Sequence, residues 1–352
     1  MEPQRTWRRA AGLLLLLCLA RDAAQLLPIP ESTGSAAQTV KALTSEPWYA
    51  LLFIEEKGTT NEYVCGGALI HPEWVVTAGH CVYPRGTLST KATVYLHQSA
   101  KATSASTYMI SPSYEAETLI PHPVFNIRTL DNDIALIHLP TAVPPSIDPL
   151  RFSWDKTDWD ALLEQNVLDN AMATVQGYGK NSTGGLGVMR TVKLSPRLTN
   201  WDKSCPMWSA AVTHGDLCAG GEDLVNEVVQ QPCAGDSGSP IFWDAADSAV
   251  NWKAMRPAWM DGLSGKALAY GLTSRGNGLC GQVKGAAPTI FTAMFRFGTF
   301  VAANVPAPTD GRAWPPSQPP GTGQPTLPTK PFLSRGGRVR VAVALLVFTF
   351  VV

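Results

Sequence analysis

Short apolar runs broken by turn-forming residues fill the chain from about Trp48 to Val305, and they constrain the fold more than any other feature. The runs are rich in β-branched residues, partly alternate with polar ones, and are separated by Gly, Pro and Asn. Many short strands with turn signals between them are typical of an all-β barrel or sandwich. The clearest runs are Tyr49–Ile54, Trp74–Ala78, Ala92–Leu96, Ile134–Leu139, Ala173–Gln176 and Ala267–Thr273, and two further stretches favour helices, Trp159–Leu168 and Phe295–Ala303.

The N-terminus has the pattern of a secretory signal. Three arginines precede the apolar run Ala10–Ala20, and small residues follow it. Such a run is too short to span a bilayer and has the usual length of a cleaved signal core. We therefore assign residues 1–24 to a signal peptide and residues 25–42 to a pro-segment or linker, and we expect a secreted protein.

The composition changes after Val305. Residues 306–334 are rich in Pro, Gly, Thr and Ser, which bury too little apolar surface to fold and predict an extended stalk. Residues 335–352 end in the apolar run Val341–Val352, which as a helix reaches only about 18 Å, short of the ~30 Å hydrocarbon core. Two interpretations stay open: a lipid-anchor signal that attaches the protein to the cell surface, or an apolar end without fixed structure.

The charge balance and the spacing of His and Cys residues argue against nucleic-acid binding and metal binding. Basic and acidic residues both number 28, so the formal net charge is zero and no basic stripe predicts nucleic-acid binding. No His or Cys cluster has metal-ligand spacing, and we expect no metal and no cofactor. Asn181 opens the sequon Asn-Ser-Thr, a glycosylation site in an exported chain.

Six of the 7 cysteines lie outside the signal peptide, and an even number in an exported chain predicts three disulfide bonds. The spacing alone leaves the pairing open. The six are Cys65, Cys81, Cys205, Cys218, Cys233 and Cys280.

Three short motifs carry the residue types that nucleophilic catalysis needs. A serine hydroxyl attacks only when a base takes its proton, and imidazole titrates near neutrality. A buried carboxylate must hold that imidazole in the productive tautomer, and backbone N–H groups must stabilise the oxyanion. We therefore predict a triad of His80, Asp133 and Ser237, with the N–H groups of Gly235 and Ser237 as the oxyanion hole. The motifs are Thr77–Cys81 (TAGHC), Asp131–Leu136 (DNDIAL) and Gly235–Pro240 (GDSGSP).

These motifs, in this order, resemble the chymotrypsin/trypsin family of serine proteases over about residues 43–305. The resemblance implies two packed six-stranded antiparallel β-barrels with a C-terminal helix, and a site in the cleft between the barrels. It implies a serine endopeptidase that acts on polypeptide substrates through an acyl-enzyme and that protein inhibitors can bind. The disulfide bonds of the family map onto Cys65–Cys81, Cys205–Cys218 and Cys233–Cys280.

The specificity pocket departs from the trypsin-like pattern. Gln231 aligns with the position that is aspartate in trypsin-like members, so a basic substrate side chain would enter unpaired. Ser274, Gly276 and Thr289 complete the expected pocket, in which Gly276 leaves one wall open and Thr289 narrows the other. We expect cleavage after small or medium uncharged residues and not after Arg or Lys. Arg275 stands where the family commonly has tryptophan, beside the strand that pairs with the substrate backbone.

The activation route also departs from the family. The counterpart of Asp236 pairs there with the amine of a processed N-terminus, and we expect Asp236 to organise the oxyanion loop. Residues 34–37 lack the usual Ile-Val-Gly-Gly start, and no basic residue directly precedes them. Either an atypical cut between Ala24 and Lys41 frees an amine, or an internal group replaces it, which is slightly favoured. A further departure is Trp154–Leu168, an apparent insertion.

A second function stays open beside the peptidase. The missing activation start favours a protease-like binding module that has lost turnover. The intact triad opposes it.

Overall fold

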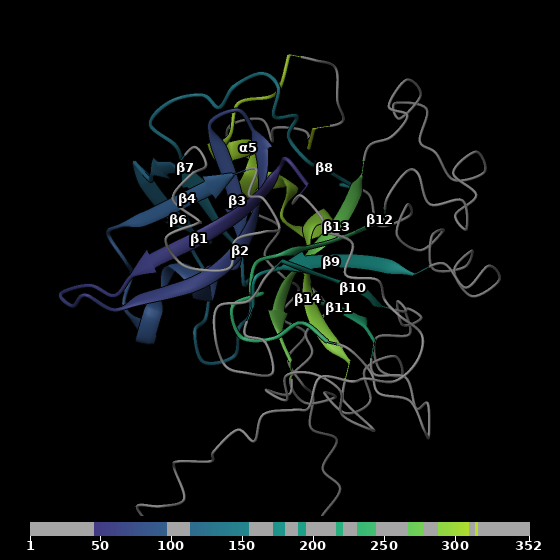
Figure 1. Ribbon diagram of the computed structural model, residues 1–352, viewed down its shortest axis with the longest axis horizontal. Helices are drawn as coiled ribbons and strands as arrows, with labels where there is room; N and C mark the ends of the chain where they lie inside the picture. The colour runs from purple at the N-terminus through teal and green to yellow at the C-terminus, as the bar shows by residue number, and fades with distance from the viewer. Residues whose placement is uncertain are drawn as a thin grey trace, which may run out of the picture. The chain divides into compact units, whose positions relative to one another are not determined.

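The described part of the chain forms two curled, largely antiparallel β-sheets and one short α-helix (Figure 1). The computed structural model describes residues 46–96, 113–154, 172–179, 189–194, 216–220, 231–243, 267–276, 288–309 and 314–315. The all-β fold expected from the sequence is confirmed. The six strands named from the sequence match observed strands to within one or two residues at either end.

The first sheet has the strand order β5-β4-β1-β2-β3-β7-β6. The interior strand β1 is paired on both sides, by β2 and by β4, and is almost entirely buried. Toward the edge, β4 alternates between buried and half-buried residues, which is the period of a strand with one face on the core. The strands are β1 (Tyr49–Glu55), β2 (Glu62–His71), β3 (Trp74–Thr77), β4 (Ala92–Leu96), β5 (Ser113–Glu115), β6 (Thr118–Pro121) and β7 (Ala135–His138).

The second sheet has the order β10-β9-β12-β13-β14-β11, and the two-residue strand β8 pairs with β13 in parallel. Within the described residues each sheet thus has seven strands, one more than the six that the resemblance implied. The strands are β8 (Arg151–Phe152), β9 (Ala173–Gly177), β10 (Arg190–Leu194), β11 (Asp216–Ala219), β12 (Pro240–Trp243), β13 (Leu268–Arg275) and β14 (Thr289–Ala293).

The helical segments are short. The expected C-terminal helix is present as α5 (Gly298–Asn304), which follows the 3₁₀ turn η6 (Met294–Arg296). Two further 3₁₀ turns, η1 (Gly79–Val82) and η2 (Pro84–Gly86), follow β3.

The folded part continues beyond the predicted stalk boundary at residue 305. The Trp314 ring lies 5.9 Å from that of Trp154, and Trp314 packs against the hydrophobic core. Pro315 is buried next to Gly298 of α5. The apolar rings of this short stretch pack on the domain although the surrounding composition is that of a linker.

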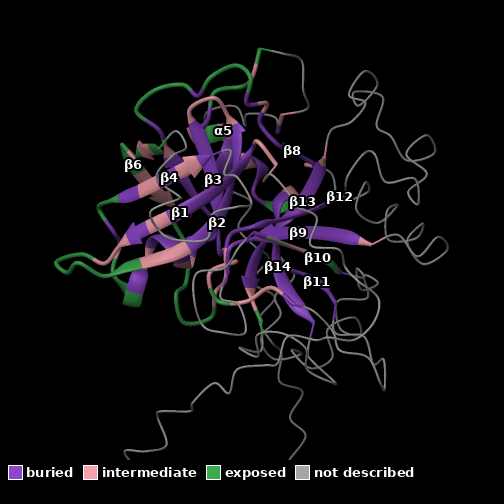
Figure 2. Cartoon of the chain, in the orientation of Figure 1, coloured by how far each residue is buried: buried purple, intermediate pink, exposed green. Residues whose placement is uncertain are grey.

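The core joins the two sheets. Buried residues concentrate along the strands, while exposed ones lie in the connections (Figure 2). The Trp48 ring, directly before β1 of the first sheet, meets Phe242 of β12 in the second sheet edge-on, with centroids 5.1 Å apart. The fully buried Tyr49 hydroxyl lies 3.1 Å from Ser239 Oγ, just before β12. Burial raises the pKa of Tyr49, which therefore stays neutral as a hydrogen-bonding group.

Several predictions from the sequence lie outside the described residues. They include the signal peptide, the pro-segment, the helix Trp159–Leu168, the sequon at Asn181 and the apolar C-terminal tail. Among the described residues, no helix is both long and apolar enough to cross a membrane.

The Tyr49–Ser239 contact predicts a measurable stability loss. Replacing Tyr49 by Phe leaves the Ser239 hydroxyl without this buried partner, and we expect the free energy of unfolding to fall by about 1 kcal/mol. Urea unfolding followed by fluorescence measures the change. Tyr63→Phe is the matched control, because the Tyr63 hydroxyl accepts only a hydrogen bond from an exposed arginine, Arg85, and its removal should cost less than about 0.5 kcal/mol. Equal losses in the two variants would contradict this account.

Candidate active site

His80 and Asp133 meet directly after β3. The turn η1 redirects the chain, so that the His80 backbone N–H donates to Asp133 Oδ1 at 2.8 Å. The His80 ring nitrogen Nδ1 lies 2.8 Å from Oδ2 of the same carboxylate. Asp133 is 1% exposed, whereas the His80 side chain is 23% exposed. The imidazole therefore has a fixed inner edge and an outer edge that can receive another group.

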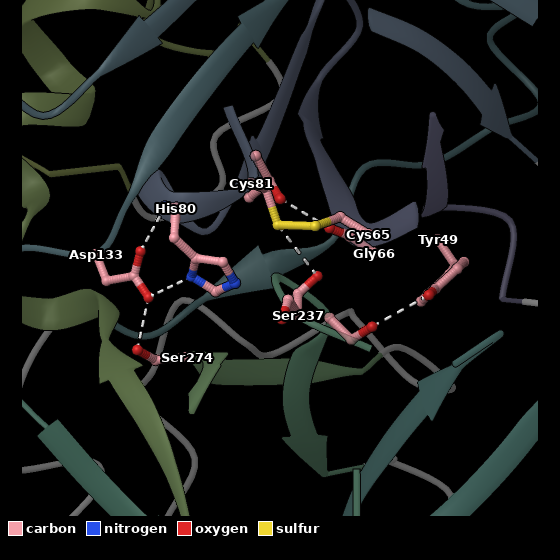
Figure 3. The surroundings of a disulfide bond; sticks show 10 residues. Tyr49, Cys65, Gly66, His80, Cys81, Asp133, Ser237 and Ser274 are labelled. Atoms are coloured by element: carbon pink, nitrogen blue, oxygen red, sulfur yellow. Dashed lines mark hydrogen bonds and ion pairs between the residues drawn. A yellow bond between two sulfur atoms is a disulfide. The ribbon is translucent and has the colours of Figure 1, made fainter. Parts of the chain in front are cut away.

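The second sheet also contributes to Asp133. Ser274 on β13 donates its hydroxyl proton to Asp133 Oδ2 at 2.6 Å (Figure 3). Thr292 on β14 donates to the Asp133 backbone carbonyl at 3.0 Å. Ser274 was expected only as a pocket residue, and its contact with the carboxylate was missed because nothing in the sequence relates β13 to Asp133. The buried charge is thus satisfied by donors from both sheets.

The electrostatic surroundings change the basicity of His80. Burial lowers the pKa of its imidazole, but the charge of Asp133 and the hydrogen bond to it raise the pKa more strongly. The net result is a pKa above the ordinary value, and the nearby charge of Arg275 works against this increase. The Nδ1–Asp133 bond also determines the tautomer, because Nδ1 must carry the proton when the ring is neutral.

Ser237 lies on the other side of the imidazole from Asp133 (Figure 3). Its backbone carbonyl accepts a hydrogen bond from Gly66 N on β2 at 2.7 Å. Cys65 and Cys81 form a disulfide bond, as the resemblance implied, and Cys81 Sγ lies 3.6 Å from the same carbonyl oxygen. The disulfide thus links the residue after His80 to the strand that holds the Ser237 loop.

The serine and the imidazole do not share a hydrogen bond of 3.5 Å or less within the described residues. This is common without substrate, since catalytic hydrogen bonds tighten when the substrate binds.

The Ser237 loop packs so tightly that one position requires glycine. Gly238 has a φ of 81°, and a Cβ there would overlap the Thr77 hydroxyl and the Gly66 carbonyl. Among the described residues, no acceptor takes the N–H of Gly235 or of Ser237. These two N–H groups are the donors of the predicted oxyanion hole.

Asp236 connects this loop to the end of β9. Its carboxylate accepts hydrogen bonds from the backbone N–H of Gly179 at 2.7 Å and of Cys233 at 2.8 Å. A Cβ at Gly177 or at Gly179 would overlap the carboxylate. The Gly-Tyr-Gly sequence that begins at the last residue of β9 thus packs tightly against the Asp236 carboxylate.

All four residues of the predicted specificity pocket lie in the described part of the chain. Gln231 and Thr289 are buried at 6% and 1% exposure, whereas Gly276 is exposed and has no atom within 4 Å of a built Cβ. Cys218 and Cys233 are disulfide-bonded, and their expected partners Cys205 and Cys280 lie outside the described residues.

One ion pair of the site was not expected from the sequence. Arg275 Nη2 donates to Asp216 Oδ2 at 2.6 Å, and both side chains are nearly buried, at 11% and 6% exposure. Asp216 lies on β11, two strands away from Arg275, so only the sheet order reveals the contact.

Comparisons with known proteins agree with this arrangement. The Trypsin family pattern matches residues 37–300. Urokinase-type plasminogen activator of Gallus gallus is 28% identical over 78% of this chain, and trypsin of Phaedon cochleariae is 30% identical over 54%. The alignments span 57% of the plasminogen activator and 69% of the trypsin.

A solved structure of HL collagenase shares the fold. It superposes with a TM-score of 0.51 at 22% identity, covering 75% of this chain and 95% of the collagenase chain. The ordered motifs, the two sheets and the matched residues lead to one conclusion: the chain belongs to the trypsin family of serine proteases.

Proposed function

We propose that the chain is a secreted serine endopeptidase in which Ser237 is the nucleophile, His80 its base and Asp133 the carboxylate that orients the base. One observation carries the proposal: the buried Asp133 carboxylate holds the His80 ring by its Nδ1 atom and leaves the outer ring edge toward Ser237. In the proposed reaction the Ser237 oxygen attacks the substrate carbonyl carbon, and the hydroxyl proton moves to His80 Nε2. The proton then passes to the leaving amine as the acyl-enzyme forms.

The oxyanion of the tetrahedral intermediate would bind to the N–H groups of Gly235 and Ser237. These donors are supported by their lack of acceptors within the described residues. Water then attacks the acyl-enzyme, with His80 again as the base. Turnover requires neutral His80, so activity should fall as the pH drops through the raised pKa of this residue.

Polypeptides are the proposed substrates, and protein inhibitors are the second class of partner. The disulfide bond and the N-terminal pattern support export. The proposed order of regions is a signal peptide at 1–24, a pro-segment or linker at 25–42, the protease domain at 43–305, a stalk at 306–334 and an apolar tail at 335–352. Attachment of that tail to a membrane as a lipid anchor is part of the same proposal.

The pocket is proposed to take uncharged side chains. The buried Gln231 offers an amide and no carboxylate, so a guanidinium or ammonium group next to it would be desolvated without a counter-charge.

Activation without a processed N-terminus is also proposed. The backbone donors of Gly179 and Cys233 give Asp236 hydrogen bonds that do not depend on a freed amine. A carboxylate that accepts backbone N–H bonds is stabilised in its charged form. The binding module without turnover remains the second candidate, on the single ground that residues 34–37 lack the family start.

The triad assignment predicts a specific loss of peptidase activity. Ser237→Ala and His80→Ala should each lower kcat by about 10⁴-fold or more, because the nucleophile and its base act as one unit. Hydrolysis of a peptide library, followed by mass spectrometry, measures the loss. Ser113→Ala, an exposed serine on β5, is the control and should keep wild-type rates. Turnover that survives Ser237→Ala would overturn the assignment.

The pocket assignment predicts the residue before the cleaved bond. The wild-type enzyme should cleave after small or medium uncharged residues, and Gln231→Asp should raise kcat/KM for lysine substrates by about tenfold or more, since a carboxylate compensates the buried ammonium. The same peptide library compares the two proteins. A wild-type preference for Arg or Lys would refute the pocket proposal.

The tight packing around Asp236 predicts a loss of activity that can be separated from a loss of stability. Gly177→Ala pushes a methyl group into the Asp236 carboxylate, so the oxyanion loop should shift and kcat should fall by about 10². Gly58→Ala is the matched control: its φ of 81° is also unfavourable for alanine, but nothing lies within 4 Å. The control should lose about 1 kcal/mol of stability and keep full activity. Unchanged activity of Gly177→Ala would show that Asp236 does not organise the loop.

A further inference from the structure

Arg275 and Asp216 form a nearly buried ion pair beside the catalytic residues. Arg275 ends β13 and Asp216 begins β11, and Nη2 lies 2.6 Å from Oδ2. With side-chain exposures of 11% and 6%, neither charge is well hydrated. Removal of one partner of such a pair leaves the other charge uncompensated, so the two residues depend on each other.

The same guanidinium reaches the triad through Ser274. Arg275 Nη1 lies 3.3 Å from Ser274 Oγ, and Ser274 Oγ lies 2.6 Å from Asp133 Oδ2. Arginine can only donate, and an ionised carboxylate can only accept. The Ser274 hydroxyl must therefore accept from Arg275 and donate its single proton to Asp133. Arg275 thus supports the orientation in which this hydroxyl donates to Asp133.

Further charged groups surround the pair. Arg296 on η6 is near Asp216 and Asp131; burial lowers the pKa of Arg296, and these two carboxylates raise it. Asp216 therefore lies near two guanidinium groups, and among the described residues Asp133 and His80 are further titratable groups near Arg275. The positive charge of Arg275 lowers the pKa of His80. Because the Asp216 carboxylate lies against this guanidinium, we expect its negative charge to oppose that effect.

We propose that Arg275 and Asp216 are a positioning pair for the triad. Asp216 holds the Arg275 guanidinium against Ser274, and this contact keeps the Ser274 hydroxyl donating its hydrogen bond to the carboxylate that orients His80. Arg275 contacts Ser274, and Asp216 contacts Arg275, so both are proposed to act through other residues. Arg275 stands where the family commonly has tryptophan, so this chain has an ionic contact where an aromatic ring is usual. The inference rests on the proposed function, because the positioned group is its base.

The pH dependence of kcat/KM tests the pair, because removing each charge has an opposite effect on His80. Arg275→Gln removes a positive charge, so the pKa of His80 rises and the acid limb of the profile moves to higher pH. Asp216→Asn leaves Arg275 uncompensated, so the acid limb moves to lower pH. Both variants should lower kcat by about tenfold as Ser274 loses its orientation. Arg275→Lys keeps the positive charge but loses the guanidinium that contacts Ser274 and Asp216 together. The acid limb of its pH profile should stay where it is in the wild type, while its kcat should fall.

Two further proteins complete the design. The double variant Arg275→Gln/Asp216→Asn removes both charges, folds without a buried lone ion, and should bring the acid limb back toward that of the wild type. Lys91→Gln breaks a distant exposed ion pair with Glu55 and should leave the profile unchanged. Acid limbs that coincide in all variants, or that move in the same direction in both single variants, would overturn the proposal.

A second readout separates this inference from the proposed function. NMR titration of His80 in the Ser237→Ala protein needs no turnover, and its midpoint should move in the same directions with the same substitutions. If the wild-type enzyme cleaves no peptide but these midpoints move as expected, the proposed function fails and the positioning pair stands. If the enzyme cleaves peptides but the midpoints do not move, only the positioning pair fails.

Discussion

The arrangement of this protein depends on one buried carboxylate. Asp133 is almost fully removed from water, and a charge in such a place is tolerated only with several hydrogen-bond donors. Its carboxylate accepts hydrogen bonds from His80 on η1, next to the first sheet, and from Ser274 on β13 of the second sheet. Its backbone carbonyl accepts one from Thr292 on β14. The requirement to satisfy Asp133 therefore holds the two sheets in the arrangement that brings His80 to Ser237.

Close backbone packing provides the second constraint. The Ser237 loop rests on β2 through the Gly66 hydrogen bond, and the space around Gly238 and Gly177 admits no side chain. The glycines of the motif are thus explained by contact with neighbouring backbone and with Asp236. Beyond the loop, the charged Arg275 requires Asp216 because an arginine at a nearly buried position needs a counter-charge. The triad carboxylate and this ion pair are therefore connected, through Ser274, in one hydrogen-bond network.

The sequence predicted the strand runs and the residues of the candidate site because both depend on local patterns. Tyr49–Ile54 and Ala92–Leu96 show the composition and alternation of strands, and the motifs around His80, Asp133 and Ser237 are each short. The contacts between distant segments could not be predicted in this way. Ser274 donates to Asp133, 141 positions earlier in the chain. Arg275 pairs with Asp216 across the intervening strand β14, and only the strand order of the sheet shows that the two are close. The packing of Trp314 was missed because its surroundings have the composition of a linker.

Labelling with a fluorophosphonate tests the central claim most directly, since this probe reacts only with an activated serine. The folded protein, with its N-terminus sequenced and uncut between Ala24 and Lys41, would be labelled near pH 8, and the adduct would be located by peptide mass mapping. The Asp133-centred site predicts a single adduct on Ser237 that is absent from the His80→Ala protein. An adduct that forms only after trimming would contradict activation without a processed N-terminus. No adduct in either form would contradict the activation of Ser237 itself.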